Sequence, residues 1–261
     1  MRFSFLIICF AVNSCFGQKG IYAEVMAGAS GYSGDLTQSS FSFHTAGPAG
    51  GIGLKYVSGD FFEFRVELFA GKVSGDDKFN SHADLKNRNL NFKTNILEGS
   101  ACVEFNLADP DIYFSYPYLF GGIGVFHFNP YTSTSTNKKV YLQPLSTEGE
   151  GLPEYPGRNK YSLTQVCLPF GGGWKVKIHD GFMLSFEFGI RYLFTDYLDD
   201  VSTTYVDPEI LRAEKGALAV EVASRQAHPA IPGDIRGNPK VKDMYGFGGV
   251  KAAFYLGRKK K

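Results

Sequence analysis

Apolar and polar residues alternate along eight segments of the chain, and this period of two is typical of β-strands. The clearest alternation runs from Phe62 to Ala70, where Glu63, Arg65 and Glu67 separate apolar residues. Because successive side chains of a strand point to opposite faces, each segment has one apolar and one polar face. The pattern predicts an all-β fold. Its strands are expected at residues 20–30, 47–57, 61–74, 92–107, 116–128, 163–178, 182–194 and 244–256.

The links between these segments alternate strictly between short and long. The short links lie around 58–60, 108–111 and 179–181, and the long ones cover 31–46, 75–91, 129–162 and 195–243. Antiparallel strands joined in this order place every long link at one end of the sheet. Outer-membrane barrels have this arrangement, with short periplasmic turns and long external loops. The sequence therefore predicts an eight-stranded antiparallel up-and-down transmembrane β-barrel with long extracellular loops, and a soluble β-sandwich is the alternative.

The polar faces of the predicted strands carry equal numbers of acidic and basic residues, six of each. In a narrow lumen each charge needs a partner of opposite sign, whereas the outer faces of a soluble sandwich need no such balance. The equal numbers therefore favour a barrel with a charged interior. An eight-stranded barrel is just wide enough for side chains, so general porin activity is not expected. The predicted lumenal residues are Glu24, Lys55, Glu63, Arg65, Glu67, Glu98, Glu104, Lys175, Lys177, Glu187, Arg191 and Lys251.

Glycine clusters fall inside four predicted strands, at 50–53, 121–124, 171–173 and 246–249. Glycine in tightly curved strands relieves crowding and lets an aromatic ring lie over bare backbone. A dinucleotide-binding loop would need a helix directly after the glycines, and here the strand pattern continues. Aromatic residues near the segment ends either form interfacial girdles or act as strand formers. They are Phe61, Tyr113, Phe114, Tyr116, Tyr118, Phe126, Phe128, Phe182, Tyr245 and Tyr255.

The first residues have the three-part layout of a secretory signal peptide. Arg2 precedes a mostly apolar run, and small residues stand before Gln18, so we expect residues 1–17 to be removed and 18–261 to form the barrel domain. Lipidation at Cys15 is the alternative, although the residues before it fit that signal poorly. No later stretch approaches the roughly 18 apolar residues of a membrane helix. The balance of 27 Lys and Arg against 26 Asp and Glu argues against a nucleic-acid partner.

The last long link contains an acidic cluster formed by Asp196, Asp199, Asp200 and Asp207. These carboxylates either anchor the link to the barrel rim or bind calcium, which prefers oxygen ligands. The spaced acids and turn glycine of an EF-hand are missing, so anchoring is the favoured interpretation. Residues 208–224 of the same link predict a short amphipathic helix. Acids of the other long links are expected to be solvated: Asp76, Asp77, Glu148 and Glu150.

Three further residues could carry chemistry. His127 lies near an external strand end, where lipid-modifying barrels place a base, but no serine stands two residues on to share its face. A buried or interfacial histidine is the favoured interpretation. Cys102 and Cys167 fall on inward positions of strands that are not adjacent, and a disulfide between them would have to span the lumen. We expect small buried thiols there.

Several stretches resemble an exported barrel family of the Bacteroidota. The most specific is FTDYLDDVSTTYVD at 194–207, and the others are RNLNFKTNI at 88–96, FGGIGVFHFNP at 120–130, LQPL at 142–145, TEG at 147–149, YSLTQ at 161–165 and RGNP at 236–239. Together they are similar to the PorG-like family, which contains an outer-membrane component of the type IX (Por) secretion system. The resemblance covers nearly the whole mature chain. Its most specific stretch includes Thr195, Asp196, Tyr197, Asp199, Asp200, Ser202, Thr203, Tyr205 and Asp207.

The resemblance implies an eight-stranded barrel in the outer membrane, surrounded by lipid and in contact with periplasmic secretion-system proteins. We expect a non-enzymatic protein that works through partner contacts, without a cofactor, a metal or a small-molecule substrate. An alternative is a structural or adhesive barrel that binds external ligands through loops 129–162 and 195–243. A lipid-modifying barrel enzyme is the third hypothesis.

Overall fold

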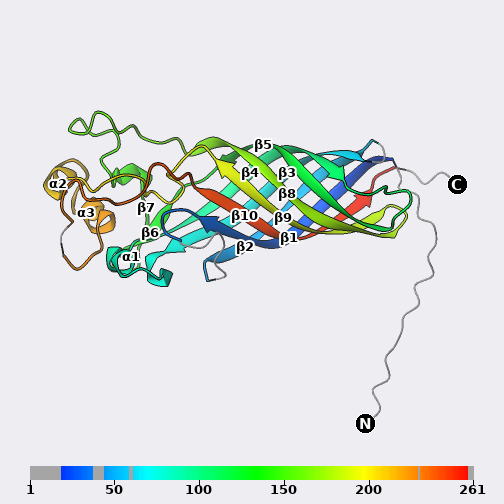
Figure 1. Cartoon of the computed structure of the whole chain (residues 1–261). Coiled ribbons are helices and arrows are strands. Elements are labelled where there is room, and N and C mark those ends of the chain that lie inside the picture. The colour runs from blue at the N-terminus through cyan, green and yellow to red at the C-terminus, as the bar shows by residue number, and fades with distance from the viewer. Residues whose placement is uncertain (1–18, 38–43, 59–60, 229, 258–261) are drawn as a thin grey trace, which may run out of the picture.

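Eight long antiparallel strands form a closed barrel (Figure 1). The computed structural model describes residues 19–37, 44–58, 61–228 and 230–257. Each strand pairs with its neighbours along the chain, and the pairing of the first strand, β1, with the last, β10, completes the ring. Every strand begins and ends within three residues of its predicted bounds, so the barrel prediction is confirmed. The strands are β1 (Gly20–Ser33), β2 (Ala46–Val57), β3 (Phe62–Asp76), β4 (Asn91–Asn106), β5 (Ser115–His127), β8 (Thr164–His179), β9 (Phe182–Leu193) and β10 (Met244–Tyr255).

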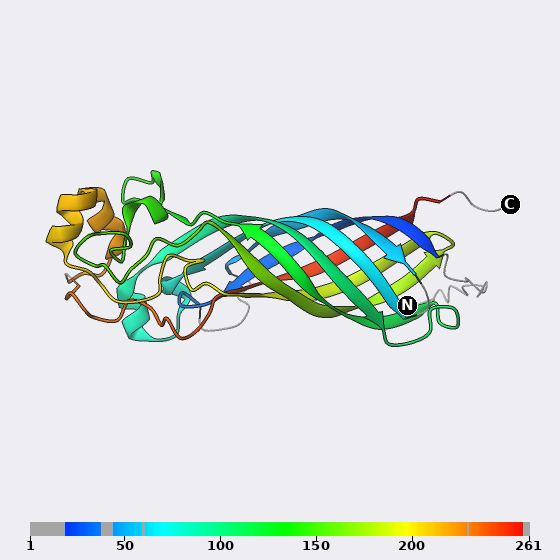
Figure 2. The same ribbon diagram turned by 90° about the horizontal axis from the view of Figure 1, so that it is seen from above.

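The four long links gather at one end of the barrel, where they form a cap (Figures 1 and 2). The cap consists of the described residues within 34–45, 77–90, 128–163 and 194–243. Where the sequence predicts one helix, the structure has two, because Gly216 adopts a φ of 86° that interrupts the helix. The elements of the cap are η1 (Asp77–Phe79), α1 (Ala83–Arg88), β6 (Tyr131–Ser133), β7 (Lys139–Tyr141), η2 (Gln143–Leu145), α2 (Pro208–Lys215) and α3 (Ala217–Ala223).

The opposite end of the barrel holds the short turns. The start of β1 and the end of β10 also lie there, with Tyr22 opposite Tyr255. Residues 59–60 of the β2–β3 turn and the predicted signal peptide, 1–17, lie outside the described residues. No helix in the described part of the chain is long and apolar enough to cross a bilayer. In barrels of this topology the end with the short turns faces the periplasm.

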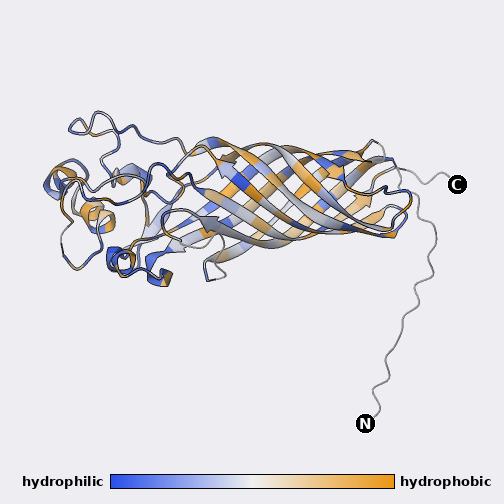
Figure 3. Cartoon of the chain, in the orientation of Figure 1, coloured by the Kyte–Doolittle hydropathy of each residue, from blue (hydrophilic) through white to orange (hydrophobic). Residues whose placement is uncertain are grey.

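The outer wall of the barrel is apolar on every strand. Leu68, Leu97 and Phe186 have 57%, 60% and 63% of their surface exposed. Figure 3 shows hydrophobic and hydrophilic positions alternating along the barrel strands. A contiguous apolar surface of this extent is not stable against water, and a closed barrel presents it to lipid without leaving strand edges unpaired. Other outward side chains include Ile21, Val25, Ile52, Leu54, Phe64, Val66, Ile123, Phe170 and Phe188.

The interior changes from ionic to aromatic toward the cap. Charged side chains fill the lower and middle lumen, whereas an aromatic cluster fills the external part. The aromatic rings are buried here because they stand at inward strand positions and because an eight-stranded lumen is just wide enough for side chains. The girdle interpretation is therefore wrong for five residues, each at most 1% exposed: Tyr116, Tyr118, Phe126, Phe128 and Tyr245. Phe61, Tyr113 and Phe114 do remain exposed near the short turns.

Glycine makes room for one of the interior rings, that of Phe120. A Cβ atom on Gly171 would lie 2.9 Å from Phe120 Cε1 and 2.7 Å from the Cα of Gly189. A Cβ atom on Gly189 would lie 2.6 Å from Phe120 Cζ. The predicted packing of an aromatic ring over bare strand backbone is confirmed at this position. The guanidinium of Arg65 makes a cation–π contact with the same ring, 4.2 Å from its centre.

Replacing Gly171 by valine should lower the free energy of unfolding by about 1–3 kcal/mol, because the new side chain overpacks the site. Gly121→Val is the matched control on the neighbouring strand, since a Cβ atom there meets nothing within 4 Å. Refolding into lipid vesicles at increasing urea, followed by gel mobility of unboiled samples, measures both. Equal urea midpoints for the two variants would contradict the packing described for Phe120.

Candidate functional site

Glu104 on β4 is the centre of a network of buried ion pairs that crosses the lumen. Its carboxylate lies 2.5 Å from Lys175, 2.6 Å from Arg65 and 3.0 Å from Lys55. Lys55 also lies 2.7 Å from Glu24. These residues come from β1, β2, β3, β4 and β8, so the network connects opposite walls of the barrel.

Glu187 on β9 extends the network to the remaining strands. It accepts hydrogen bonds from Arg65 at 2.5 Å and from the Tyr118 hydroxyl of β5 at 2.6 Å. Lys251 of β10 lies 3.0 Å from Glu187 and also pairs with Glu67. All eight barrel strands therefore contribute a group to one network. Close pairing of opposite charges offsets the cost of removing each ion from water.

The other predicted lumenal charges lie above and below this network. Toward the cap, Arg191 Nε donates to Glu98 at 2.9 Å, and the Tyr245 hydroxyl donates to the same carboxylate at 2.7 Å. Toward the periplasm, Lys177 of β8 donates to the carbonyl oxygen of Pro110 in the β4–β5 turn. The structure places all twelve predicted residues inside the barrel, each with an exposed fraction of 8% or less.

Apolar layers close the lumen at both ends of the charged region. At the periplasmic end, Tyr22, Val57 and Met183 form a buried cluster inside the barrel. At the external end, Phe126 and Phe247 of the barrel belong to one buried core with cap residues: Leu142, Leu198, Val201 and Val222. Lifting the cap off the barrel would expose this core, at about 25 cal/mol for each Å² of apolar surface. The long links are therefore fixed to the barrel.

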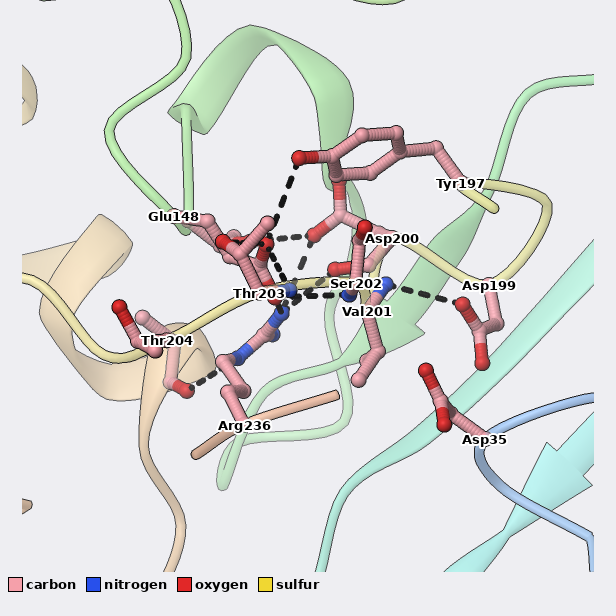
Figure 4. A network of polar contacts seen from close by, with 12 residues as sticks. Asp35, Glu148, Tyr197, Asp199, Asp200, Val201, Ser202, Thr203, Thr204 and Arg236 are labelled. Carbon is pink, nitrogen blue, oxygen red and sulfur yellow. Dashed lines mark hydrogen bonds and ion pairs between the residues drawn. The ribbon is translucent and has the colours of Figure 1, made fainter. Parts of the chain in front are cut away.

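Glu148 and Arg236 form the centre of a second buried network, which lies in the cap (Figure 4). Arg236 Nη1 donates to Glu148 Oε1 at 2.8 Å and to the carbonyl oxygen of Asp200 at 2.5 Å. Glu148 also accepts the backbone N–H groups of Ser202 at 2.9 Å and Thr203 at 2.8 Å. The Thr203 hydroxyl donates to the same carboxylate at 2.6 Å. The expectation that Glu148 is solvated is therefore wrong, because charge-assisted hydrogen bonds enclose it within the cap.

Arg88 at the end of α1 joins three of the long links. Its Nε and Nη2 donate to the two oxygens of Asp77 at 2.8 Å and 2.7 Å. Its Nη1 donates to the Arg236 carbonyl at 2.5 Å, and Nη2 also donates to the Asp35 carbonyl at 2.8 Å. Asp77 is fully buried, so it too is not the solvated charge that the sequence suggested. The bidentate guanidinium of Arg88, together with the N–H of Leu90 at 2.9 Å, satisfies this buried carboxylate.

The stretch 194–207 follows β9 and leads to α2 in the cap. Asp200 accepts hydrogen bonds from the hydroxyl groups of Thr147 at 2.5 Å and Tyr161 at 2.6 Å. Asp207 is the N-cap of α2 and accepts the N–H of the second helical residue. A carboxylate at this position satisfies an amide that lacks an intrahelical partner. The other predicted residues of the stretch are buried or half-buried: Thr195, Asp196, Tyr197, Asp199, Ser202, Thr203 and Tyr205.

Two buried carboxyl groups share one hydroxyl at the barrel rim. The Tyr32 hydroxyl donates to Asp199 and lies 3.3 Å from Asp243. A hydroxyl has one proton to donate, so the second carboxyl is accommodated best when it carries a proton. Burial, reinforced by neighbouring carboxylates, raises the pKa of both Asp199 and Asp243 well above the usual range.

Burial also raises the pKa of three other carboxyl groups in the cap. The pKa of Glu150 rises to about 8 through burial and then through the charges of Asp200 and Glu148. The pKa of Asp196 rises to about 7, and that of Asp200 rises to about 6 despite the positive charge of Arg236. Glu150 is only 1% exposed, which also overturns its expected solvation. The cap therefore holds more buried acids than its arginines neutralise.

The carboxylates of this stretch are engaged by hydroxyl, amide and guanidinium groups. Among residues 19–37, 44–58, 61–228 and 230–257, no group of three or more His, Cys, Asp or Glu side chains is arranged to hold a metal ion. These contacts fit the anchoring interpretation of the acidic cluster and give no support to a calcium site.

The remaining candidates have simple surroundings. Cys102 and Cys167 are free and buried, as predicted. His127 lies exposed on the outer wall, with Nδ1 3.0 Å from Thr164 Oγ1. The described hydrogen bonds of this pair include no carboxylate that would orient the ring as in a catalytic triad. An interfacial histidine satisfied by its neighbour accounts for what is seen.

Sequence reasoning missed the partners that hold the cap together. Arg236 stands in the sequence only as a member of the RGNP stretch, without an assigned role, and Glu148 was expected to be solvated. Tyr32 and Asp243 were not singled out, because nothing in a local pattern shows that their strand ends are neighbours. The one signal in the sequence was that Arg236 and Glu148 each fall in a stretch that carries the family resemblance.

The closed barrel and its apolar wall define a class, the transmembrane β-barrels of the kind found in bacterial outer membranes. Within that class, the chain belongs to the family described as a domain of unknown function, DUF6089, whose model matches residues 1–213. No curated protein sequence matches the chain.

Three solved outer-membrane proteins are similar to this chain at low sequence identity. Neisserial surface protein A is 9% identical with a TM-score of 0.44, over 90% of this chain and 96% of that chain. The attachment invasion locus protein Ail of Yersinia pestis is 8% identical with a TM-score of 0.43, over 91% and 99%. OprG of Pseudomonas aeruginosa is 8% identical with a TM-score of 0.37, over 92% and 99%.

The cap should loosen as the pH rises. A raised carboxyl pKa gives stability that is present in full below the ordinary value, 4.5 for Glu150, and that is lost as the pH rises through about 8. Hydrogen exchange of amides in 146–151 and 195–203, corrected for the intrinsic rate, should show roughly tenfold or more opening at about pH 9 relative to about pH 5.

Glu150→Gln mimics the neutral carboxyl and should reduce this pH dependence. Glu154→Gln, at an exposed position of the same link, is the matched control and should leave it unchanged. Equal protection of the wild-type cap at both pH values would contradict the assignment of neutral buried acids.

Proposed function

We propose that this protein is a non-enzymatic component of the type IX secretion machinery in the outer membrane of Bacteroidota, exported by its signal peptide. The observation that carries the proposal is the filled lumen, in which paired charges from all eight strands lie between two apolar layers. A barrel filled in this way acts through its two ends, as a component that contacts partners. The PorG-like resemblance of the sequence supports the choice of machinery.

The periplasmic end offers an apolar surface on the β4–β5 turn. Ile112, Tyr113 and Phe114 have 72%, 54% and 60% of their surface exposed. The carbonyl of Asp109 accepts the N–H groups of Ile112 and Tyr113, which gives the turn a defined shape. Large apolar side chains exposed on a shaped turn fit contact with another protein. We propose periplasmic secretion-system proteins as the partners.

One observation favours the second candidate, an adhesive barrel that binds external ligands. The cap contains a groove of about 360 Å³ lined by α2, α3 and Tyr205. These helices lie at the part of the cap that is farthest from the barrel (Figure 1). Nearby in the chain, Ile231 and Ile235 have 65% and 81% of their surface exposed. A groove of this size on a fixed surface is large enough to hold part of a ligand.

Two matched variants separate these functions in a deletion strain. The turn variant carries Ile112→Ser with Tyr113→Ser, and the cap variant carries Ile231→Ser with Ile235→Ser. The secretion proposal predicts that the turn variant loses crosslinked periplasmic secretion proteins and lowers protein export several-fold, while the cap variant keeps both. Affinity purification after crosslinking of intact envelopes, together with assay of exported proteins, measures the two effects.

Unchanged export in the deletion strain would remove the secretion role. Loss of binding to external ligands in the cap variant alone would favour the adhesive function instead. Unboiled gel mobility identical to wild type shows that each variant retains its barrel.

A further inference from the structure

The lipid-facing wall ends at a defined height on β3 and β4. On β3 the outward apolar positions end at Ala70, and the next outward residue is Lys72. On β4 they end at Leu97, and Asn95 and Lys93 are the next outward residues. Each apolar run spans about nine residues, the length that a tilted strand needs to cross the hydrocarbon core. The two lysines therefore stand at its external edge.

Strand register places these lysines on one continuous outward face. Lys72 and Lys93 are diagonal neighbours on adjacent strands, close enough for long side chains to reach the same group. Lys93 lies opposite Tyr131 of β6, and Tyr131 lies opposite Tyr141 of β7. The face thus continues from the lipid-facing wall of β3 and β4 onto the short strands of the cap.

A third lysine is held over this face by the two tyrosines. Lys139 Nζ lies 3.9 Å from the centre of the Tyr131 ring and 4.6 Å from that of Tyr141. It also donates to the Tyr141 hydroxyl at 3.0 Å. Cation–π contact on two sides keeps the ammonium group close to the surface. Tyrosine and lysine above an apolar wall are the residues that membrane interfaces favour.

Positive charge is in excess on this face. The acidic residue of β3 beyond Lys72 is Asp76, which already pairs with Lys78 at 2.8 Å. In the described part of the chain, no carboxylate lies within 4.0 Å of the ammonium group of Lys72 or of Lys93. At the edge of the face, Glu221 accepts the N–H of Ser135 and Arg225 donates to the carbonyl of Ser133, so this pair of opposite charges leaves the excess of lysines unchanged.

We propose that this face binds the phosphate groups of anionic lipids in the external leaflet. The ring of Tyr141, 44% exposed, lies at the boundary between hydrocarbon and head groups, and the ammonium groups reach the phosphates directly above it. Each ammonium group donates up to three hydrogen bonds, so neighbouring lysines bind one phosphate together. The proposal rests on the barrel's position in a membrane and is independent of any role in secretion.

Binding is measured on the full-length protein reconstituted in phosphatidylcholine nanodiscs that contain lipid A with or without its phosphates. Wild-type protein should retain phosphorylated lipid A selectively, as counted by native mass spectrometry. Lys72→Gln with Lys93→Gln should weaken this retention roughly tenfold or more. Lys160→Gln with Lys215→Gln removes the same charge elsewhere in the cap and should have no such effect. Lys72→Arg with Lys93→Arg should keep retention.

Several results would overturn the proposal. The first is that the Lys72→Gln, Lys93→Gln variant retains phosphorylated lipid A as well as the wild-type protein does. The second is that the test and control variants lose retention equally. The third is that the wild-type protein retains both forms of lipid A equally. Competition by millimolar inorganic phosphate in detergent, without any preference for lipid, would show a free-anion site instead. Unboiled gel mobility shows whether each variant is folded. If the glutamine variant does not fold, the wild-type protein alone still tests the proposal, because equal retention of lipid A with and without its phosphates overturns it.

Discussion

Charge pairing across the lumen is the constraint on which the rest of the structure depends. Glu104 and Glu187 are surrounded by cations from facing walls, and each of these ions is tolerable out of water only while its partners stay in place. The pairs exist only if the sheet closes, since residues on β3 and β9 meet across the interior. Closure in turn places every opposite face outward, where its apolar side chains require lipid. The alternation of apolar and polar residues along each strand therefore specifies both the paired interior and the membrane-facing wall.

Closure of the barrel also fixes the cap, which is held by apolar packing and by arginine–carboxylate contacts. Above the ion pairs, Phe126 and Phe247 extend the interior as an apolar core that includes Leu198 and Val201 of the last long link. Arg236 and Arg88 then tie the links to one another through buried carboxylates. External loops held in this way form a shaped surface, and the filled lumen confines activity to that surface and to the periplasmic turns.

The strands and the lumenal charges could be predicted from the sequence because both depend on a local period of two. The height at which the interior changes from ionic to aromatic could not be predicted. The alternation of residues shows which face of the strand Phe126 or Tyr245 lies on, but not which side chains surround it. The cap was less predictable still. Glu148 looks like a solvated loop acid until Arg236, 88 residues away in the chain, is brought beside it. Loops have no periodicity from which such a pairing could be inferred.

The two buried cysteines test the filled lumen most directly. Cys102 lies among the ion pairs at 5% exposure, and Cys167 lies within the aromatic core at 0%. A water-soluble maleimide added to the folded protein in vesicles should leave both thiols unmodified, and should modify both after denaturation. Rapid modification of either thiol in the folded protein would show a water-filled lumen and contradict the account.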